Sequence, residues 1–161
     1  MKQKVDHPIP PVFDEHSHTL ILGSFPSVLS RKTEFFYGHP QNRFWRVLSE
    51  VLGRDVAHTV EEKRALLLSE GIALWDVIGS CKIEGSADST ISDVVPNDLA
   101  LILERAPIRR IFVNGKTAKR YYDLYQRSRL GIDAICLPST SRANASFSLE
   151  RLVAEWGVIK L

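Results

Sequence analysis

The feature that most constrains the fold of this 161-residue chain is an alternation of short apolar runs with segments of helical periodicity. Four apolar runs have the length of buried strands, at residues 19–22, 72–77, 110–113 and 134–137. Amphipathic helices are predicted between or after them, at residues 44–52, 59–71, 97–107, 117–127 and 148–156. Strands joined through helices form a parallel sheet that is covered on both faces. The pattern therefore predicts an α/β three-layer sandwich with a central four-stranded parallel sheet.

Two helix starts carry capping signals. Thr59 followed by Glu62 is typical of a capping box, and Asn97 or Asp98 is expected to cap the helix that ends near Pro107. The chain contains no repeat or linker, so we expect one domain over residues 1–161, with residues 1–17 as an N-terminal extension.

Composition excludes several classes of protein. No apolar run approaches the length of a membrane helix, and the first residues lack the apolar region of a secretion signal. The two cysteines, Cys81 and Cys136, form no CxxC pair, and a reducing cytoplasm is the expected compartment.

The formal net charge of +2 conceals an uneven distribution. Residues 1–104 carry a local charge of −5, residues 105–129 carry +7, and the remainder is balanced. The basic segment is a candidate surface for an anionic partner, although taken alone it is more typical of a solvated helix face. We expect its arginines near residues 105–110 to be solvated, at the edge of the sheet away from any site.

All four predicted strands are followed by segments rich in Gly, Pro, Ser or Asn. In a parallel sheet these segments emerge at the same edge, where ligands bind. They are residues 23–27, 78–80, 114–117 and 138–144.

Some familiar motifs are incomplete. Gly115-Lys116-Thr117 lacks the first glycine of a phosphate-binding loop, because Arg110 stands five positions earlier. His16 and His18 have no third ligand, so we expect neither a metal nor another cofactor. No serine lies in a Gly-x-Ser-x-Gly elbow, which disfavours acyl transfer.

The densest chemistry lies in residues 35–45, where several aromatic side chains stand beside Tyr37, His39, Gln41 and Asn42. Such residues suit a pocket that stacks a flat ring and hydrogen-bonds to its edge. Phe44 and Trp45 have helical spacing and are expected in the core.

These residues are similar to the first conserved region of the uracil-DNA glycosylase superfamily, and the chain most resembles its hypoxanthine-DNA glycosylases, also called DNA-deoxyinosine glycosylases. The resemblance spans about residues 18–157. The matching segments are residues 22–27 (LGSFPS), 36–45 (FYGHPQNRFW), 74–77 (LWDV), 85–88 (GSAD), 112–115 (FVNG) and 137–141 (LPSTS).

The resemblance implies a monofunctional DNA glycosylase of base excision repair that flips out a deaminated base, hypoxanthine above all, and hydrolyses its N-glycosidic bond. One position departs from the mismatch-specific uracil glycosylases, which carry an Asn that orients water after the first strand. Phe25 stands there and cannot orient water. The hypoxanthine-type family is thought to use the Asn of the Asn-Arg-Phe-Trp stretch instead, here Asn42.

The resemblance and the residue chemistry together assign three groups of site residues. The catalytic group is expected to position water, donate a hydrogen bond or supply charge, and it comprises Asn42, His39 and Asp76. The base-binding group comprises Phe25, Tyr37 and Asn114. The DNA-binding group comprises Ser27, Lys116, Ser139, Thr140, Ser141, Arg142 and Asn144. Asp88 is interpreted as a carboxylate that orders its loop.

The expected partner is DNA that contains a damaged base, bound by a monomer without contact to a membrane. Two alternatives stay open. One is a glycosylase of the same fold that prefers uracil or thymine in mismatches, and the other is a non-catalytic nucleic-acid-binding module.

Overall fold

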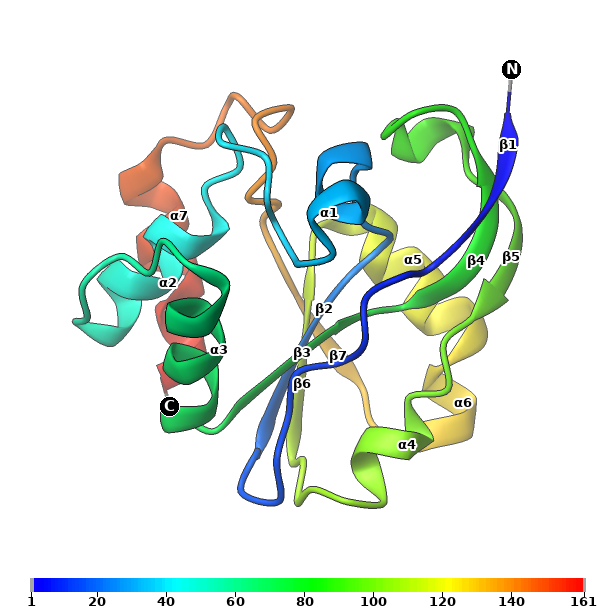
Figure 1. Cartoon of the computed structure of the whole chain (residues 1–161). Helices are drawn as coiled ribbons and strands as arrows, with labels where there is room; N and C mark the ends of the chain where they lie inside the picture. The colour runs from blue at the N-terminus through cyan, green and yellow to red at the C-terminus, as the bar shows by residue number, and fades with distance from the viewer. Residues whose placement is uncertain (1, 161) are drawn as a thin grey trace.

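In the computed structural model, which describes residues 2–160, a four-stranded parallel sheet occupies the centre of the molecule (Figure 1). Its strand order is β3-β2-β6-β7. Every residue of β2 and β3 is buried, because both faces of a parallel sheet are covered. The four predicted strands are confirmed, as β2 (Thr19–Gly23), β3 (Ile72–Asp76), β6 (Arg110–Asn114) and β7 (Ala134–Leu137).

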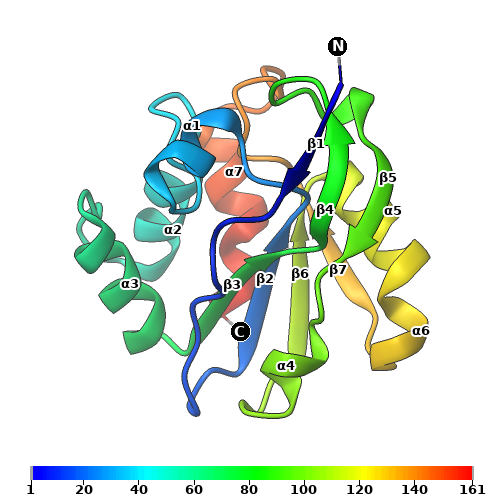
Figure 2. The ribbon, with the colours of Figure 1, turned by 45° about the vertical axis from the view of Figure 1, so that its right-hand side comes forward.

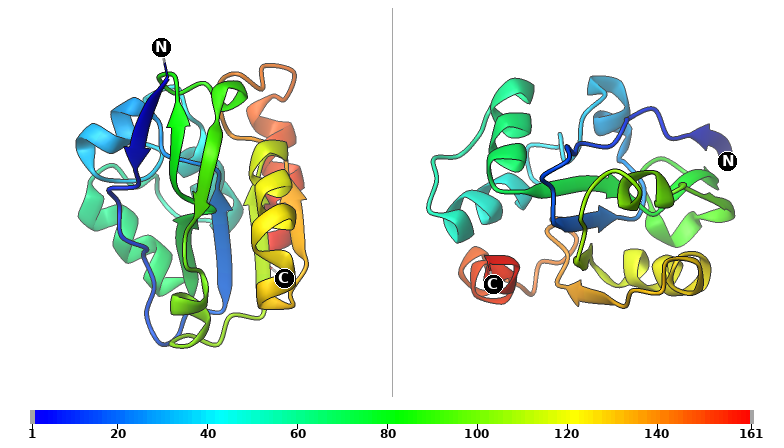
Figure 3. Two further views of the ribbon diagram at one scale, coloured as in Figure 1. Left: turned by 90° about the vertical axis from the view of Figure 1, so that its right-hand side faces the viewer. Right: turned by 90° about the horizontal axis from the view of Figure 1, so that it is seen from below.

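Helices lie on both sides of this sheet, as the α/β prediction requires (Figures 2 and 3). Helix α5 (Lys116–Tyr125) packs against β6 and β7, and α3 (Val60–Ser69) packs against β3. Helix α7 (Leu149–Trp156) packs on α2 (Phe44–Leu52). The capping box of Thr59 and Glu62 is present. The longer helices are α2 (Phe44–Leu52), α3 (Val60–Ser69), α5 (Lys116–Tyr125) and α7 (Leu149–Trp156), and the short ones are α1 (Val28–Thr33), α4 (Ala100–Leu103), α6 (Arg127–Leu130), η1 (Asp88–Thr90) and η2 (Gly157–Lys160).

A second sheet is antiparallel and was not predicted. It has the order β1-β4-β5, formed by β1 (Gln3–Asp6), β4 (Ile78–Ile83) and β5 (Ser92–Pro96). The expectation that residues 78–80 form a loop is wrong, because these residues begin β4. Their Gly and Ser are typical of turns, but Ile78, Cys81 and Ile83 are buried and the segment pairs with β1 on one side and β5 on the other.

The N-terminal residues are built into the fold. Val12 pairs with Leu74 through two backbone hydrogen bonds, and the indole of Trp75 donates to the carbonyl oxygen of Ile9. Ile9 and Val12 are buried in the core. The stretch after β1 therefore covers the edge of the sheet beside β3.

Two further predictions are wrong. Neither Asn97 nor Asp98 caps a helix with its side chain. The buried Asn97 amide instead donates to the backbone carbonyls of Asp76 and Ile78, at the carboxyl end of β3. Arg110 is half-buried rather than solvated, because it donates to the carbonyls of Val158 and Ile159 and anchors the end of the chain.

The strand order creates a crevice. β2 lies between β3 and β6, so the segments that leave β2 and β6 diverge at their carboxyl ends. Within residues 2–160, no helix is long and apolar enough to cross a membrane.

Candidate active site

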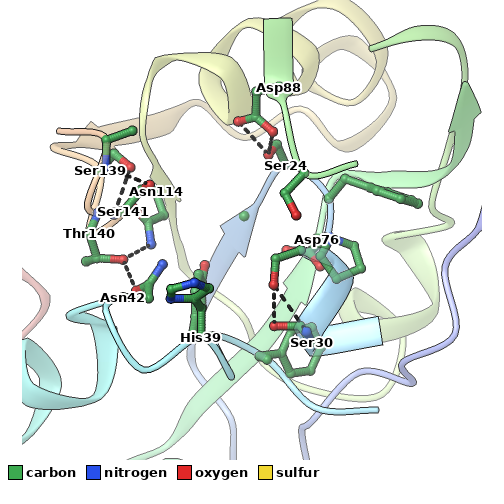
Figure 4. A pocket seen from close by; sticks show the side chains of 18 of the residues that line it. Ser24, Ser30, His39, Asn42, Asp76, Asp88, Asn114, Ser139, Thr140 and Ser141 are labelled. Atoms are coloured by element: carbon green, nitrogen blue, oxygen red, sulfur yellow. Dashed lines mark hydrogen bonds between the residues drawn. The ribbon is translucent and has the colours of Figure 1, made fainter. Parts of the chain in front are cut away.

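A cavity of about 510 Å³ opens at the carboxyl ends of β2, β3 and β6 (Figure 4). Three of the four segments expected at this edge contribute to its walls. Eleven of the thirteen predicted site residues line it: Phe25, Ser27, Tyr37, His39, Asn42, Asp76, Asn114, Ser139, Thr140, Ser141 and Arg142. Lys116 and Asn144 are not among the lining residues.

A directional chain of hydrogen bonds joins two amides across the fully buried Thr140 (Figure 4). The Asn114 amide nitrogen donates to the Thr140 hydroxyl at 3.0 Å, and that hydroxyl donates to Asn42 Oδ1 at 2.8 Å. The Thr140 backbone N–H donates back to Asn114 Oδ1 at 3.0 Å. Each amide can therefore have only one orientation.

The same chain determines what Asn42 offers to a ligand. Its Oδ1 also accepts from the Phe44 backbone N–H at 2.9 Å, at the start of α2, so both lone pairs of this oxygen are used. The amide nitrogen has no hydrogen-bond partner within residues 2–160. Asn42 thus presents N–H donors to the cavity, and Asn114 has one N–H beyond the one given to Thr140.

Asp76 lies at the end of β3 and forms a buried pair with His7. The two side chains are 5% and 2% exposed, and His7 Nε2 is 2.7 Å from Asp76 Oδ2. Nothing in the sequence pattern links these residues, which are 69 positions apart. His7 is a site residue that the sequence did not predict.

Tyr37 has an unusual backbone conformation, with φ of 52° in a region that favours glycine. Its ring stacks on Phe44, with centroids 4.1 Å apart. Burial raises the pKa of its hydroxyl, and the Asp76 carboxylate raises it further, whereas Asn114 lowers it. Because its pKa is raised, the hydroxyl stays protonated and can donate a hydrogen bond. It is shielded from solvent and has no well-formed hydrogen bond in the described chain.

Gly23 leaves space for these groups at the bottom of the cavity. A Cβ added there would lie 2.4 Å from Asp76 Oδ1 and 2.9 Å from the Tyr37 hydroxyl. The carboxylate and the phenol therefore close over the glycine.

Two aromatic rings complete the walls. Phe25 meets His7 edge-on at 5.8 Å, and the Arg31 guanidinium lies 5.6 Å from its centroid. His39 Nδ1 accepts from the Gln41 backbone N–H at 3.1 Å. The neutral His39 ring therefore carries its proton on Nε2, which has no partner among residues 2–160.

Arg43 holds the loop at residues 138–147, and sequence reasoning missed it although it lies in the predicted dense stretch. Its guanidinium donates to the carbonyls of Phe147, Ser141 and Asn144. Its backbone N–H donates to the Thr140 carbonyl at 3.0 Å. One side chain thus connects the start of α2 to a loop about a hundred residues later.

The remaining predicted residues lie around the same loop. The Asn144 amide donates to the Ser139 carbonyl at 3.0 Å, which shapes the loop from within. Arg142 is exposed and hydrogen-bonds to Gln41. Lys116 is exposed at the first position of α5, next to Gly115, whose close approach to Ser139 leaves little room for a side chain.

Asp88 forms part of the cavity rim, where it accepts from the Ser24 hydroxyl at 3.2 Å (Figure 4). Burial of its carboxylate raises its pKa; the bond from Ser24 opposes this shift and the charge of Asp76 adds to it. The residues from 2 to 160 contain no group of three metal-ligating side chains suited to hold an ion.

Comparisons with known proteins identify relatives of this chain. The family profile described as the uracil DNA glycosylase superfamily matches residues 10–157. A protein named hypoxanthine DNA glycosylase from Methanosarcina acetivorans is 38% identical over 152 residues, covering 93% of this chain and 94% of its own. Its namesake from Methanosarcina barkeri is 36% identical over 137 residues, covering 84% and 85%.

A solved structure shares the fold. The solution NMR structure of a candidate uracil DNA glycosylase from M. acetivorans superimposes with a TM-score of 0.80 at 34% identity. The match covers 99% of this chain and all of the other.

Proposed function

The chain belongs to the uracil DNA glycosylase superfamily, and we propose that it is a monofunctional DNA glycosylase that releases hypoxanthine from DNA. The observation that carries this proposal is the cavity at the strand ends, into which Asn42 and Asn114 direct neutral amide donors. The relatives named hypoxanthine DNA glycosylase support the choice of base.

Neutral donors suit the chemistry of the N-glycosidic bond. As this bond breaks, positive charge develops on the deoxyribose and negative charge on the departing base. Fixed N–H groups stabilise the negative charge at no cost in reorganisation, because the hydrogen-bond chain through Thr140 already holds them.

Asn42 is the proposed water-binding residue. Its saturated Oδ1 cannot take a proton from water, so its N–H donates to the water oxygen and leaves a lone pair free to attack the sugar. As the C–O bond forms and the C–N bond breaks, the proton that the water loses neutralises the departing base anion. A sugar that already carries positive charge needs a positioned water more than a deprotonated one.

The base itself is proposed to lie between Phe25 and the polar residues at the strand ends. Asn114 contacts its edge, and His39 Nε2 and the Tyr37 hydroxyl supply further donors as charge develops on the base. Hypoxanthine offers two acceptors for them, its six-position carbonyl oxygen and N7.

The loop held by Arg43 is proposed to bind the DNA backbone. Ser139, Thr140 and Ser141 are small enough to approach phosphates closely, and the exposed Arg142 is placed to fill the space that the flipped base vacates. Ser27 and Lys116 extend the contact, and Asn144 orders the loop.

Hydrolysis without strand cleavage follows from the residue types in the cavity. Among the described residues that line it there is no lysine to form a Schiff base. We propose that the protein acts as a monomer in the cytoplasm, where its unpaired Cys81 and Cys136 remain reduced.

A side-by-side cleavage assay tests the proposal. Duplexes that contain inosine, uracil or xanthine at one position are incubated with the protein, and abasic sites are revealed by alkali. We expect the highest kcat/KM on inosine. Cleavage of the uracil duplex alone would overturn the choice of base, and no cleavage of any duplex would favour a binding module.

A further inference from the structure

A second hollow, here called the outer hollow, lies beside the cavity and shares a wall with it. Its volume is about 310 Å³, and it is formed by the segment at residues 37–42, the first turn of α2, residues 56–58 and Lys63 of α3. Tyr37, His39 and Asn42 line both spaces, so the segment that carries them separates the outer hollow from the cavity.

The ionisable side chains of the outer hollow are all basic. Arg46 and Lys63 line it together with two imidazoles, those of His39 and His58. No Asp or Glu is among its described lining residues, whereas two carboxylates line the cavity. The outer hollow therefore suits an anionic group.

Lys63 is half-buried and lacks an anionic partner. Its ammonium lies 5.2 Å from the centroid of the Trp45 ring, and burial lowers its pKa. It forms no ion pair and no hydrogen bond with any residue between 2 and 160. Contact with an aromatic face offsets only part of the cost of removing an ammonium group from water, so an anionic ligand would stabilise this side chain.

Trp45 gives the ammonium a rigid platform. Its indole N–H donates to the Phe36 carbonyl at 3.1 Å, and the side chain is buried. Phe35 stacks on the same ring system, with centroids 6.1 Å apart. Because the platform is fixed, Lys63 is positioned before a ligand arrives, which lowers the ordering cost of binding.

Arg46 supplies a second unpaired cation. Its guanidinium is exposed and has no ion pair or hydrogen bond within the described chain. Glu50, Glu61 and Glu62 are close in sequence, but none of them lines the outer hollow, and Glu62 accepts from the Thr59 backbone N–H. An exposed cation leaves the outer hollow open to solvent, which fits one charged group of a polymer better than an enclosed small ion.

Resting on the proposed function, we propose that the outer hollow binds a phosphate group of the DNA backbone, held by Lys63 and Arg46. A strand that places a nucleotide in the cavity crosses its rim, and residues 37–42 are the part of that rim shared with the outer hollow. Neither cation is among the DNA-binding residues expected from the sequence. The contact touches neither base nor sugar, so it stabilises the bound ground state and the transition state equally.

Lys63→Gln keeps most of the length of the side chain and removes its charge. We expect DNA affinity to fall by roughly 3- to 10-fold and the slope of log affinity against log salt concentration to decrease by about one. The single-turnover rate at saturating enzyme should be unchanged. Lys160→Gln is the matched control and should alter none of these, because Arg110 holds the carbonyls of Val158 and Ile159 at the opposite end of β6.

A series of modified duplexes locates the phosphate itself. Each duplex contains 2′-fluoro-2′-deoxyinosine, whose fluorine suppresses cleavage, and one uncharged methylphosphonate in place of a phosphate near it. At one position the methylphosphonate should weaken wild-type binding by roughly 3- to 10-fold and leave the affinity of Lys63→Gln unchanged, because the cation and the phosphate act as a pair. Lys63→Arg keeps the charge and should respond as the wild type does.

Arg46→Gln provides an independent variant. Its side chain is exposed and outside the core, so the substitution is compatible with folding. It should lose the response to methylphosphonate at the same position. This variant decides the question if Lys63→Gln does not fold.

Inorganic phosphate distinguishes a DNA phosphate from a free one. If it shifts the amide NMR signals of residues 56–63 while no methylphosphonate position loses its effect in Lys63→Gln or Arg46→Gln, the outer hollow binds free phosphate and the inference is wrong.

Two results separate the inference from the proposed function. If every methylphosphonate weakens wild type and variants by the same factor while the wild type releases hypoxanthine, the inference is wrong and the proposed function stands. If the wild type releases no hypoxanthine from an inosine duplex, the proposed function itself fails.

Discussion

Asn42 is held by two hydrogen bonds that end on the same oxygen atom, one from the Phe44 backbone and one from Thr140. This arrangement makes the amide nitrogen its functional group. It also makes Asn42 part of the start of α2, so that a simple truncation would disturb both catalysis and folding.

Asn42→Asp separates these two roles. The carboxylate still accepts from Phe44 and Thr140 but lacks the N–H donors, so we expect turnover on an inosine duplex to fall by about 100- to 1,000-fold at an unchanged Tm. Single-turnover kinetics and thermal unfolding measure the two effects. A variant that keeps its activity would show that Asn42 acts through its oxygen.

The raised pKa of Asp88 is expected to make the free energy of unfolding depend on pH. Because burial raises its native pKa above the ordinary value of 3.8, the native state binds more protons than the unfolded state between these two values. The free energy of unfolding therefore falls as the pH rises through the native pKa.

Asp88→Asn removes this loss. The variant should have a higher Tm than the wild type at pH 7, and the difference should shrink as the pH is lowered toward 4. Thermal unfolding from pH 4 to 8 measures it, with Asp55→Asn, which does not line the cavity, as the control. A difference in Tm that does not vary with pH would contradict the assigned shift.

Sequence reasoning reached those site residues that are adjacent along the chain or follow a predicted strand, such as Tyr37, His39 and Asn114. It missed His7 and Arg43 because their roles depend on partners about 70 and 100 residues away. A lone histidine and an arginine inside an aromatic stretch carry no local signal of such contacts.

At the scale of elements, the loop at residues 138–147 depends on α2 for its shape. Three of its carbonyl oxygens accept from Arg43, whose fork-shaped guanidinium can reach them together. The position of Ser139, Thr140 and Ser141 is therefore set by a residue outside the loop.

Arg43→Lys should loosen this loop. A lysine ammonium keeps the charge but cannot match the fork, so we expect faster amide hydrogen exchange at residues 138–147 and about 10-fold weaker binding to DNA. Arg54→Lys, just beyond the end of α2, is the matched control. Unchanged exchange in the loop would contradict the role assigned to Arg43.

The parallel sheet was predictable because β2 and β3 are buried on both faces and all four strands contain short apolar runs, as in residues 19–22. The antiparallel sheet was not, because β4 and β5 have one exposed face and contain Gly79, Ser80 and Pro96. The pairing of β4 with β1 joins residues far apart in sequence, which local pattern does not encode.

At the scale of the whole molecule, charge acts through its position rather than its sum. The basic segment at residues 105–129 runs along β6 from Arg105, just after α4, to Lys116 at the start of α5, and then returns through α5 to α6 (Figure 1). Only the turn at Lys116 lies at the edge that carries the cavity.

The salt dependence of DNA binding distinguishes the contribution of Lys116 from that of Arg105. Lys116→Ala should reduce the slope of log affinity against log salt concentration by about one, because one phosphate contact is lost. Arg105→Ala, which removes the same charge at the opposite edge, should leave the slope unchanged. Equal effects of the two variants would contradict a localised DNA surface.

The most direct test of the account is the identity of the released base. The wild-type protein is incubated with an inosine-containing duplex, and free bases in the supernatant are identified by mass spectrometry while the strand is analysed before and after alkali. We predict stoichiometric free hypoxanthine and a strand that stays intact until alkali is added. With Asn42→Asp, we expect neither free hypoxanthine nor alkali-induced cleavage of the strand above background. Absence of free hypoxanthine from the wild type, or strand cleavage without alkali, would contradict the account.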